Sequence, residues 1–151
     1  MYTYVGYGFN ISDIADEDWV ALVKKYDSEE FEEIKNRAMK FISDPEDAEE
    51  IIIDYVSDFI DENSMSKADY LANIINAGEK EAAGTDYIVS TYDDFLVFDN
   101  VRFADDSKRT QYVRTQEDFL ALINKYVPIE HITFGNLYEG VEWIDPAFFL
   151  D

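Results

Sequence analysis

The chain has 151 residues, of which 47% are hydrophobic, and it contains 11 Tyr, 11 Phe and 2 Trp. This aromatic content excludes an acidic disordered chain, because such chains bury too little apolar surface to fold. The 34 acidic against 12 basic residues give a net charge of −22, which argues against direct binding to nucleic acid or an anionic membrane and favours a basic partner.

The length predicts one domain, residues 1–151, that is large enough to bury a core. The chain has no Cys, which excludes disulfides and thiolate zinc sites and is typical of a reducing compartment. No apolar run reaches the roughly 18 residues needed to span a bilayer, and the opening MYTYVGYGF lacks the features of a signal peptide. We therefore expect a cytoplasmic protein without a bound cofactor.

The first predicted element is a strand over Tyr2–Ile11, where residues alternate between two faces. The expected faces are Val5, Tyr7, Phe9 and Ile11 on one side, and Tyr2, Tyr4, Gly6 and Gly8 on the other. Two glycines on one face predict that another element packs closely there.

Three or four helices are expected next. Asp16 and Ser28 are the predicted N-caps of the first two. Asp44 followed by Pro45 predicts the start of the third, because Pro at the first helical position loses no hydrogen bond. Ser66 predicts the start of a fourth, through a capping box with Asp in place of the usual Glu, and Gly78 predicts its end.

The second half of the chain predicts a small sheet and one more helix. The expected segments are a hairpin of Asp86–Thr91 with Phe95–Phe98, a polar stretch Asn100–Thr110, a helix from Thr115 to before Pro128, a strand Ile132–Tyr138 and a possible return strand Val141–Ile144. This order predicts an α+β fold: an N-terminal strand, a cluster of three to four helices, then a small antiparallel or mixed sheet with one further helix.

The third helix, PEDAEEIIIDYVSDFIDEN, holds eight carboxylates and no Lys, Arg or His. Residues four apart share a helix face, so the carboxylates at Glu46, Glu50, Asp54, Asp58 and Glu62 form a ladder, with Asp47, Glu49 and Asp61 in support. The opposite, apolar side holds Ala48, Ile52, Tyr55, Val56 and Phe59, while Ile51 and Ile60 are expected to lie off this stripe.

The carboxylate ladder is locally unfavourable. Like charges four residues apart destabilise a helix by a few tenths of a kcal/mol per pair, and a local rule broken without compensation points to function. The carboxylates are spaced at about one per 3 Å of helix, near the roughly 3.4 Å per phosphate of one DNA strand. Both a nucleic-acid mimic and a plain solvated acidic face remain open.

Catalytic signals are weak. His131 is the only histidine, and we interpret it as structural or surface-exposed, since triads and zinc sites need more partners. A hard cation could bind carboxylates in the hairpin turn and the stretch that follows the hairpin, where the candidates are Asp93, Asp94, Asp99, Asp105 and Asp106. No stretch matches the calcium-loop pattern, so we predict neither a catalytic residue nor a metal ligand.

The sequence predicts a non-enzymatic acidic inhibitor that occupies the basic nucleic-acid-binding groove of a partner such as a nuclease or defence effector. Phage inhibitors of the anti-CRISPR and anti-restriction type are the analogous class, which would place the protein in the host cytoplasm. The alternatives are an immunity protein that neutralises a basic nuclease toxin, a carboxylate-metal enzyme and a structural assembly subunit.

Overall fold

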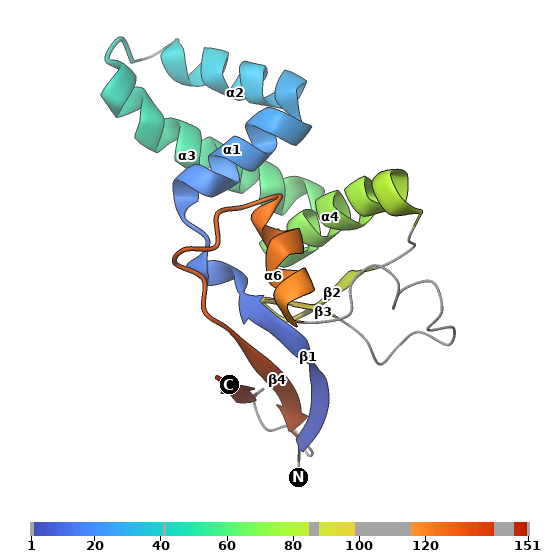
Figure 1. The fold of residues 1–151 in the computed structure, drawn as a ribbon. Coiled ribbons are helices and arrows are strands. Elements are labelled where there is room, and N and C mark those ends of the chain that lie inside the picture. The colour runs from blue at the N-terminus through green and yellow to red at the C-terminus, as the bar shows by residue number, and fades with distance from the viewer. Residues whose placement is uncertain (1, 41, 85–87, 99–115, 141–146, 151) are drawn as a thin grey trace.

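The computed structural model describes residues 2–40, 42–84, 88–98, 116–140 and 147–150. Figure 1 shows a sheet at one end and helices at the other, an α+β arrangement as predicted. The elements are β1 (Tyr2–Asn10), a short 3-10 helix (Ile11–Asp13), α1 (Asp16–Tyr26), α2 (Ser28–Met39), α3 (Pro45–Asn63), α4 (Lys67–Ala83), β2 (Val89–Tyr92), β3 (Phe95–Phe98), α6 (Gln116–Asn124), β4 (Phe134–Gly140) and β5 (Ala147–Phe149).

The five described strands form one antiparallel sheet in the order β2-β3-β1-β4-β5. The N-terminal strand β1 lies at its centre, where Gly8 is opposite Val97 on β3 and Gly135 on β4. The expectation that the first strand joins strands far away in sequence is therefore confirmed.

A bulge in β1 changes the predicted faces of this strand. Between Tyr4 and Gly6 the register with β4 shifts, which leaves Val5 without a partner on that strand. Tyr4 consequently shares a face with Tyr7, and its hydroxyl lies 3.1 Å from the side-chain oxygen of Asn136, the residue opposite Tyr7. The prediction that Tyr4 shares the face of the glycines is wrong, because simple alternation does not anticipate a bulge.

The two glycines of β1 allow a close approach, as expected. A Cβ atom at Gly8 would lie 2.0 Å from the backbone oxygen of Leu96, and one at Gly6 would lie 2.8 Å from that of Phe98. The element that approaches is the neighbouring strand β3.

Two of the four predicted helix starts are confirmed by their capping contacts. Asp44 accepts a 3.0 Å hydrogen bond from the backbone of Glu46 at the start of α3. Ser66 accepts a 3.1 Å hydrogen bond from the backbone of Asp69 at the start of α4. These side chains satisfy backbone donors that have no partner within the helix.

The predicted caps Asp16 and Ser28 are wrong by one residue. The N-cap positions are Ala15 and Asp27, neither of which makes a side-chain capping hydrogen bond. Asp27 instead accepts a hydrogen bond from Tyr70, a residue 43 positions away. A long-range contact of this kind has no local sequence signal.

The helix α4 continues past Gly78, where we predicted its end. It stops at Ala83, and Gly84 follows with a φ of 72°, the left-handed conformation that glycine adopts readily. Gly78 lies within α4 against the hydroxyl of Tyr126. Its small size serves helix packing, and it does not terminate the helix.

The β2–β3 hairpin is confirmed, although β2 spans Val89–Tyr92 where Asp86–Thr91 was predicted, and residues 85–87 lie outside the described residues. Tyr92 lies opposite Phe95, and Asp93 has a positive φ of 49° in the turn. β4 begins at Phe134, two residues later than predicted. The stretches 99–115 and 141–146 lie outside the described residues, as do the predicted return strand and the start of the last helix. β5 pairs with β4 beyond that gap.

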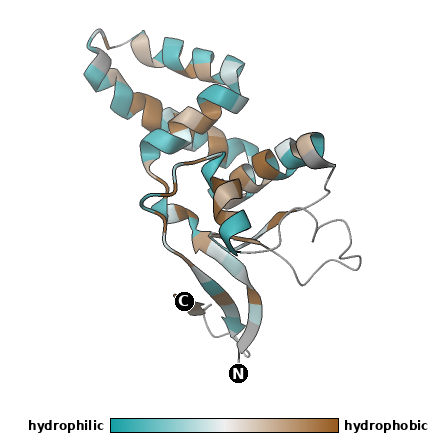
Figure 2. Ribbon diagram, in the orientation of Figure 1, coloured by the Kyte–Doolittle hydropathy of each residue, from teal (hydrophilic) through white to brown (hydrophobic). Residues whose placement is uncertain are grey.

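The core joins the helices to one face of the sheet. Phe119 of α6 is fully buried, and its ring centroid lies 6.1 Å from that of Tyr7 and 6.0 Å from those of Phe98 and Phe134. Helices α1, α2 and α3, which we call the helical lobe, extend from this core (Figure 1). Figure 2 shows hydrophilic and hydrophobic bands alternating along α2 and α3, as expected for helices with one apolar side.

Candidate functional site

The helix α3 packs into the core through one side. Ala48, Val56 and Ile60 are at most 1% exposed. Ile60, predicted to lie off the apolar stripe, is at its centre, because a residue four positions from Val56 is rotated by only about 40°. Ile51 is half-buried. The apolar side therefore fixes which residues of α3 face the solvent.

All eight carboxylates predicted as partner-binding residues are exposed: Glu46, Asp47, Glu49, Glu50, Asp54, Asp58, Asp61 and Glu62. Among the residues that the structure describes, none of these side chains forms a salt bridge or a hydrogen bond. The carboxylates of α3 therefore form no ion pairs with their described neighbours.

Three basic side chains of the helical lobe lie on aromatic rings. Lys24 lies 5.9 Å from the ring centroid of Phe31, and Lys25 lies 5.3 Å from that of Tyr26. The guanidinium of Arg37 lies 4.5 Å from the ring centroid of Tyr55. None of the three forms a salt bridge with a described carboxylate. These three cations therefore contact rings of the helical lobe and form no ion pair with its carboxylates.

The C-terminal end of α3 increases the negative potential. Its last turn contains Asp61 and Glu62 and no basic residue, whereas the last turns of α1, α2 and α4 all contain Lys or Arg. A helix carries about half a negative charge at its C-terminus. The acidic side chains and the helix dipole therefore add at this end of α3.

The carboxylate ladder leads into a groove between α2 and α3. Each step of four residues rotates the ladder by about 40°, so that Asp58 and Glu62 reach the side of α3 that faces α2. Both residues line a hollow of about 440 Å³. The ladder and the groove are thus one continuous acidic surface.

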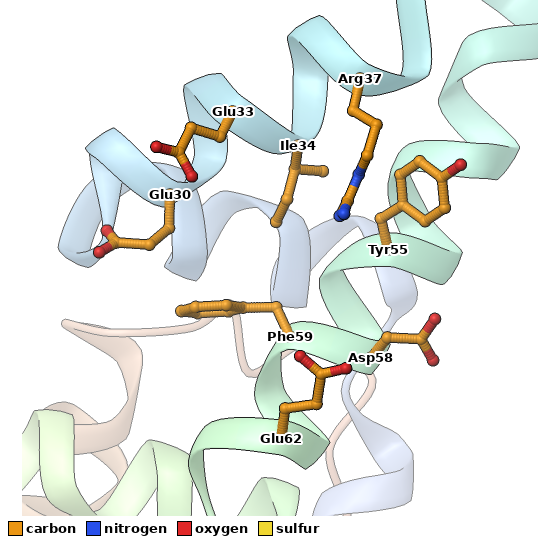
Figure 3. A pocket seen from close by; sticks show the side chains of 8 residues that line it. All are labelled: Glu30, Glu33, Ile34, Arg37, Tyr55, Asp58, Phe59 and Glu62. Atoms are coloured by element: carbon orange, nitrogen blue, oxygen red, sulfur yellow. The ribbon is translucent and has the colours of Figure 1, made fainter.

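Figure 3 shows the residues of this groove: Glu30, Glu33, Ile34 and Arg37 on α2, and Tyr55, Asp58, Phe59 and Glu62 on α3. Arg37 extends toward the ring of Tyr55, while the ring of Phe59 lies across the middle of the groove (Figure 3). We call this set the α2–α3 groove. It combines four carboxylates with two aromatic rings.

A second hollow, of about 600 Å³, continues from the first toward α4. The two share Glu30 and Phe59. The second hollow is also lined by Asp27 and Tyr70, which are joined by a hydrogen bond. Burial, followed by this hydrogen bond, raises the pKa of Tyr70 above its ordinary value.

The α2 wall of the groove was not predicted as a site. Its acidic residues belong to the run Glu29, Glu30, Glu32 and Glu33, which is visible in the sequence. That run could have indicated a second acidic helix, but only the fold shows that Glu30 and Glu33 lie opposite Asp58 and Glu62.

Two of the five carboxylates predicted as possible metal ligands lie within the described residues. Asp93 and Asp94 lie exposed in the β2–β3 turn, and the other candidates, Asp99, Asp105 and Asp106, lie outside the described residues. Within the described ranges, no group of three or more His, Asp or Glu side chains is arranged to hold a metal ion. His131 is exposed in the stretch before β4.

Comparisons with protein-family models, with curated proteins and with solved structures find no match to this chain. In the part of the chain that the structure describes, no helix is both long enough and apolar enough to cross a membrane.

Proposed function

We propose that this protein is an acidic inhibitor that acts in the cytoplasm by occupying the basic nucleic-acid-binding groove of a partner protein. The observation that carries this proposal is the exposure of all eight α3 carboxylates without a salt bridge to any described residue. A nucleic-acid-binding groove is built to receive a row of unpaired negative charges. The α3 face presents such a row on a rigid helix.

The energetics of such a complex favour a partner that normally binds DNA or RNA. Lys and Arg in a nucleic-acid-binding groove release counterions when they meet phosphates. A carboxylate face of similar charge spacing would gain the same entropy. It would also accelerate association, because complementary charges steer the encounter of two proteins. Binding, and no chemical step, is the proposed activity.

The proposal covers two classes of target. A defence nuclease inhibited by a phage protein and a nuclease toxin neutralised by an immunity protein both present a basic groove. The physical contact would be the same in the two cases. The identity of the captured partner distinguishes them.

The test is capture of partners from nuclease-treated lysate at low and high salt, followed by a nucleic-acid-binding assay of the captured protein. The variant is Glu50→Lys/Asp54→Lys/Asp58→Lys, and its charge-matched control is Glu81→Lys/Glu117→Lys/Glu130→Lys, whose positions are exposed and outside α3. We expect the wild type and the control to retain a nucleic-acid-binding protein at low salt and to block its binding to nucleic acid. The α3 variant should not retain this protein.

High salt should weaken this capture, because it screens exposed charges. If the α3 variant keeps the same partners as the wild type, the α3 face is a solvated acidic surface. If the captured partner still binds nucleic acid in the presence of the wild type, the inhibitor proposal is wrong.

A further inference from the structure

We propose that the α2–α3 groove receives an arginine side chain of the basic partner. This inference rests on the proposed function and identifies the contact that would make partner binding specific. The outward carboxylates Glu46, Glu50 and Asp54 attract any cation. The groove, in contrast, places carboxylates next to aromatic rings, a combination that distinguishes arginine from lysine.

The chemistry of guanidinium explains this preference. Its planar cation stacks on aromatic faces and donates paired hydrogen bonds to carboxylates, whereas the lysine ammonium is a compact, strongly hydrated charge. The groove supplies both kinds of contact, since the carboxylates of Glu30, Glu33, Asp58 and Glu62 line the same hollow as the ring of Phe59. Its volume of about 440 Å³ falls within the roughly 300–1,000 Å³ typical of sites that enclose small ligand groups.

The groove already holds one guanidinium. Arg37 of α2 lies in it with its guanidinium 4.5 Å from the ring centroid of Tyr55. Arg37 forms no salt bridge with the four groove carboxylates. The protein's own arginine therefore shows how a guanidinium stacks here while the carboxylates keep their capacity to bind a second one.

Phe59 provides the second stacking surface. Its ring is only partly buried, it borders both hollows, and no described cation lies over it. Tyr70 contacts it edge-on, with the ring centroids 6.4 Å apart and the planes at 83°. An incoming arginine can therefore stack on Phe59 between the carboxylates of Glu30 and Glu62.

The test measures the affinity of the full chain for blocked hexa-arginine and hexa-lysine peptides by calorimetry at about physiological salt. The groove variant is Glu30→Gln/Glu33→Gln/Asp58→Asn/Glu62→Gln. Its matched control is Glu46→Gln/Asp47→Asn/Glu50→Gln/Asp54→Asn, which neutralises the same number of charges outside the groove. We expect the wild type to bind hexa-arginine about fivefold or more tightly than hexa-lysine, because stacking adds to charge attraction.

The groove variant should lose this preference for arginine, while the control should bind both peptides more weakly and keep it. A second variant, Phe59→Leu, retains every charge and removes only the ring, so it should reduce hexa-arginine affinity and leave hexa-lysine affinity unchanged. Equal loss in groove and control variants, or an unchanged preference in Phe59→Leu, would overturn the arginine site. Neither result bears on the inhibitor proposal, because partner capture by the α3 face is read out separately.

Discussion

The hydroxyl of Tyr70 donates a 2.5 Å hydrogen bond to the carboxylate of Asp27. Tyr70 lies in the first turn of α4 and is 7% exposed, whereas Asp27 lies at the junction between α1 and α2. This hydrogen bond links the helical lobe to α4 across 43 positions of sequence. It also forms part of the wall of the second hollow.

The Tyr70–Asp27 contact predicts a loss of stability at high pH. Tyr70 has a raised pKa in the folded protein, while in the unfolded chain it ionises near 10.0. The contribution of the Tyr70 hydroxyl to the free energy of unfolding is therefore fully present below about pH 10. It falls by about 1.4 kcal/mol per pH unit as the pH rises toward the pKa of Tyr70 in the folded protein. Urea unfolding of the wild type and Tyr70→Phe between pH 7 and 11 measures the difference.

At pH 7, Tyr70→Phe should cost about 1–3 kcal/mol, because a hydrogen bond to a charged group is lost. Above pH 10 the free energies of unfolding of the two proteins should converge, since the phenylalanine variant lacks the titrating hydroxyl. Parallel curves for the two proteins over the whole pH range would contradict this account.

The carboxylate ladder predicts a stability cost that charge placement can relieve. In Glu50→Lys/Asp58→Lys, every i,i+4 pair along the ladder becomes attractive. Glu50→Lys/Asp54→Lys has the same net charge but keeps two repulsive pairs. The first variant should be more stable than the second by about 1 kcal/mol, or about 2–4 °C in melting temperature. Thermal unfolding at low and at high salt checks this difference.

Both lysine variants should also lose the partner captured by the wild type. The combination of greater stability and lost binding would indicate that the ladder is kept for recognition at the expense of folding. Equal melting temperatures at low salt would show instead that solvent already screens the ladder.

The close packing of the central strand β1 predicts that a side chain at Gly8 strongly destabilises the fold. In Gly8→Ala the new Cβ would meet the backbone oxygen of Leu96 at 2.0 Å, so β1 or β3 must move. We expect a loss of about 3 kcal/mol or more. Gly84→Ala is the control: its Cβ would meet nothing within 4 Å, and only the left-handed φ costs about 1–2 kcal/mol. Urea unfolding compares the two, and equal losses would refute the close approach.

The sequence predicted the fold class and most elements because local signals and tertiary structure agree there. The start of α3 follows from Asp44 and Pro45, and the acidic face of that helix follows from a spacing of four residues. The bulge at Val5 was missed because it depends on pairing with β4, which local alternation does not report.

The candidate site was only half visible in the sequence. The exposure of the α3 carboxylates follows from helical periodicity alone. The groove does not, because it depends on how α2 packs against α3 and on Arg37 stacking on Tyr55 across the two helices. When a site forms between two elements, the sequence order alone does not show which of their residues lie close together.

Asn76 of α4 makes another contact between elements that local sequence does not indicate. Its side-chain nitrogen donates a 3.0 Å hydrogen bond to the backbone oxygen of Val89. Its side-chain oxygen accepts from the backbone nitrogens of Ile88 and Val89 at 3.0 and 3.2 Å. One side chain of α4 therefore satisfies the first backbone groups of β2.

Asn76→Ala leaves those groups without these partners, and it should cost about 2–3 kcal/mol, because an unsatisfied buried group loses its full desolvation energy. Asn73→Ala is the matched control one turn earlier, on an exposed side chain, and it should change stability by less than about 0.5 kcal/mol. Hydrogen exchange should show faster opening of Val89 in Asn76→Ala, and equal exchange in the two variants would mean that α4 does not hold this edge of the sheet.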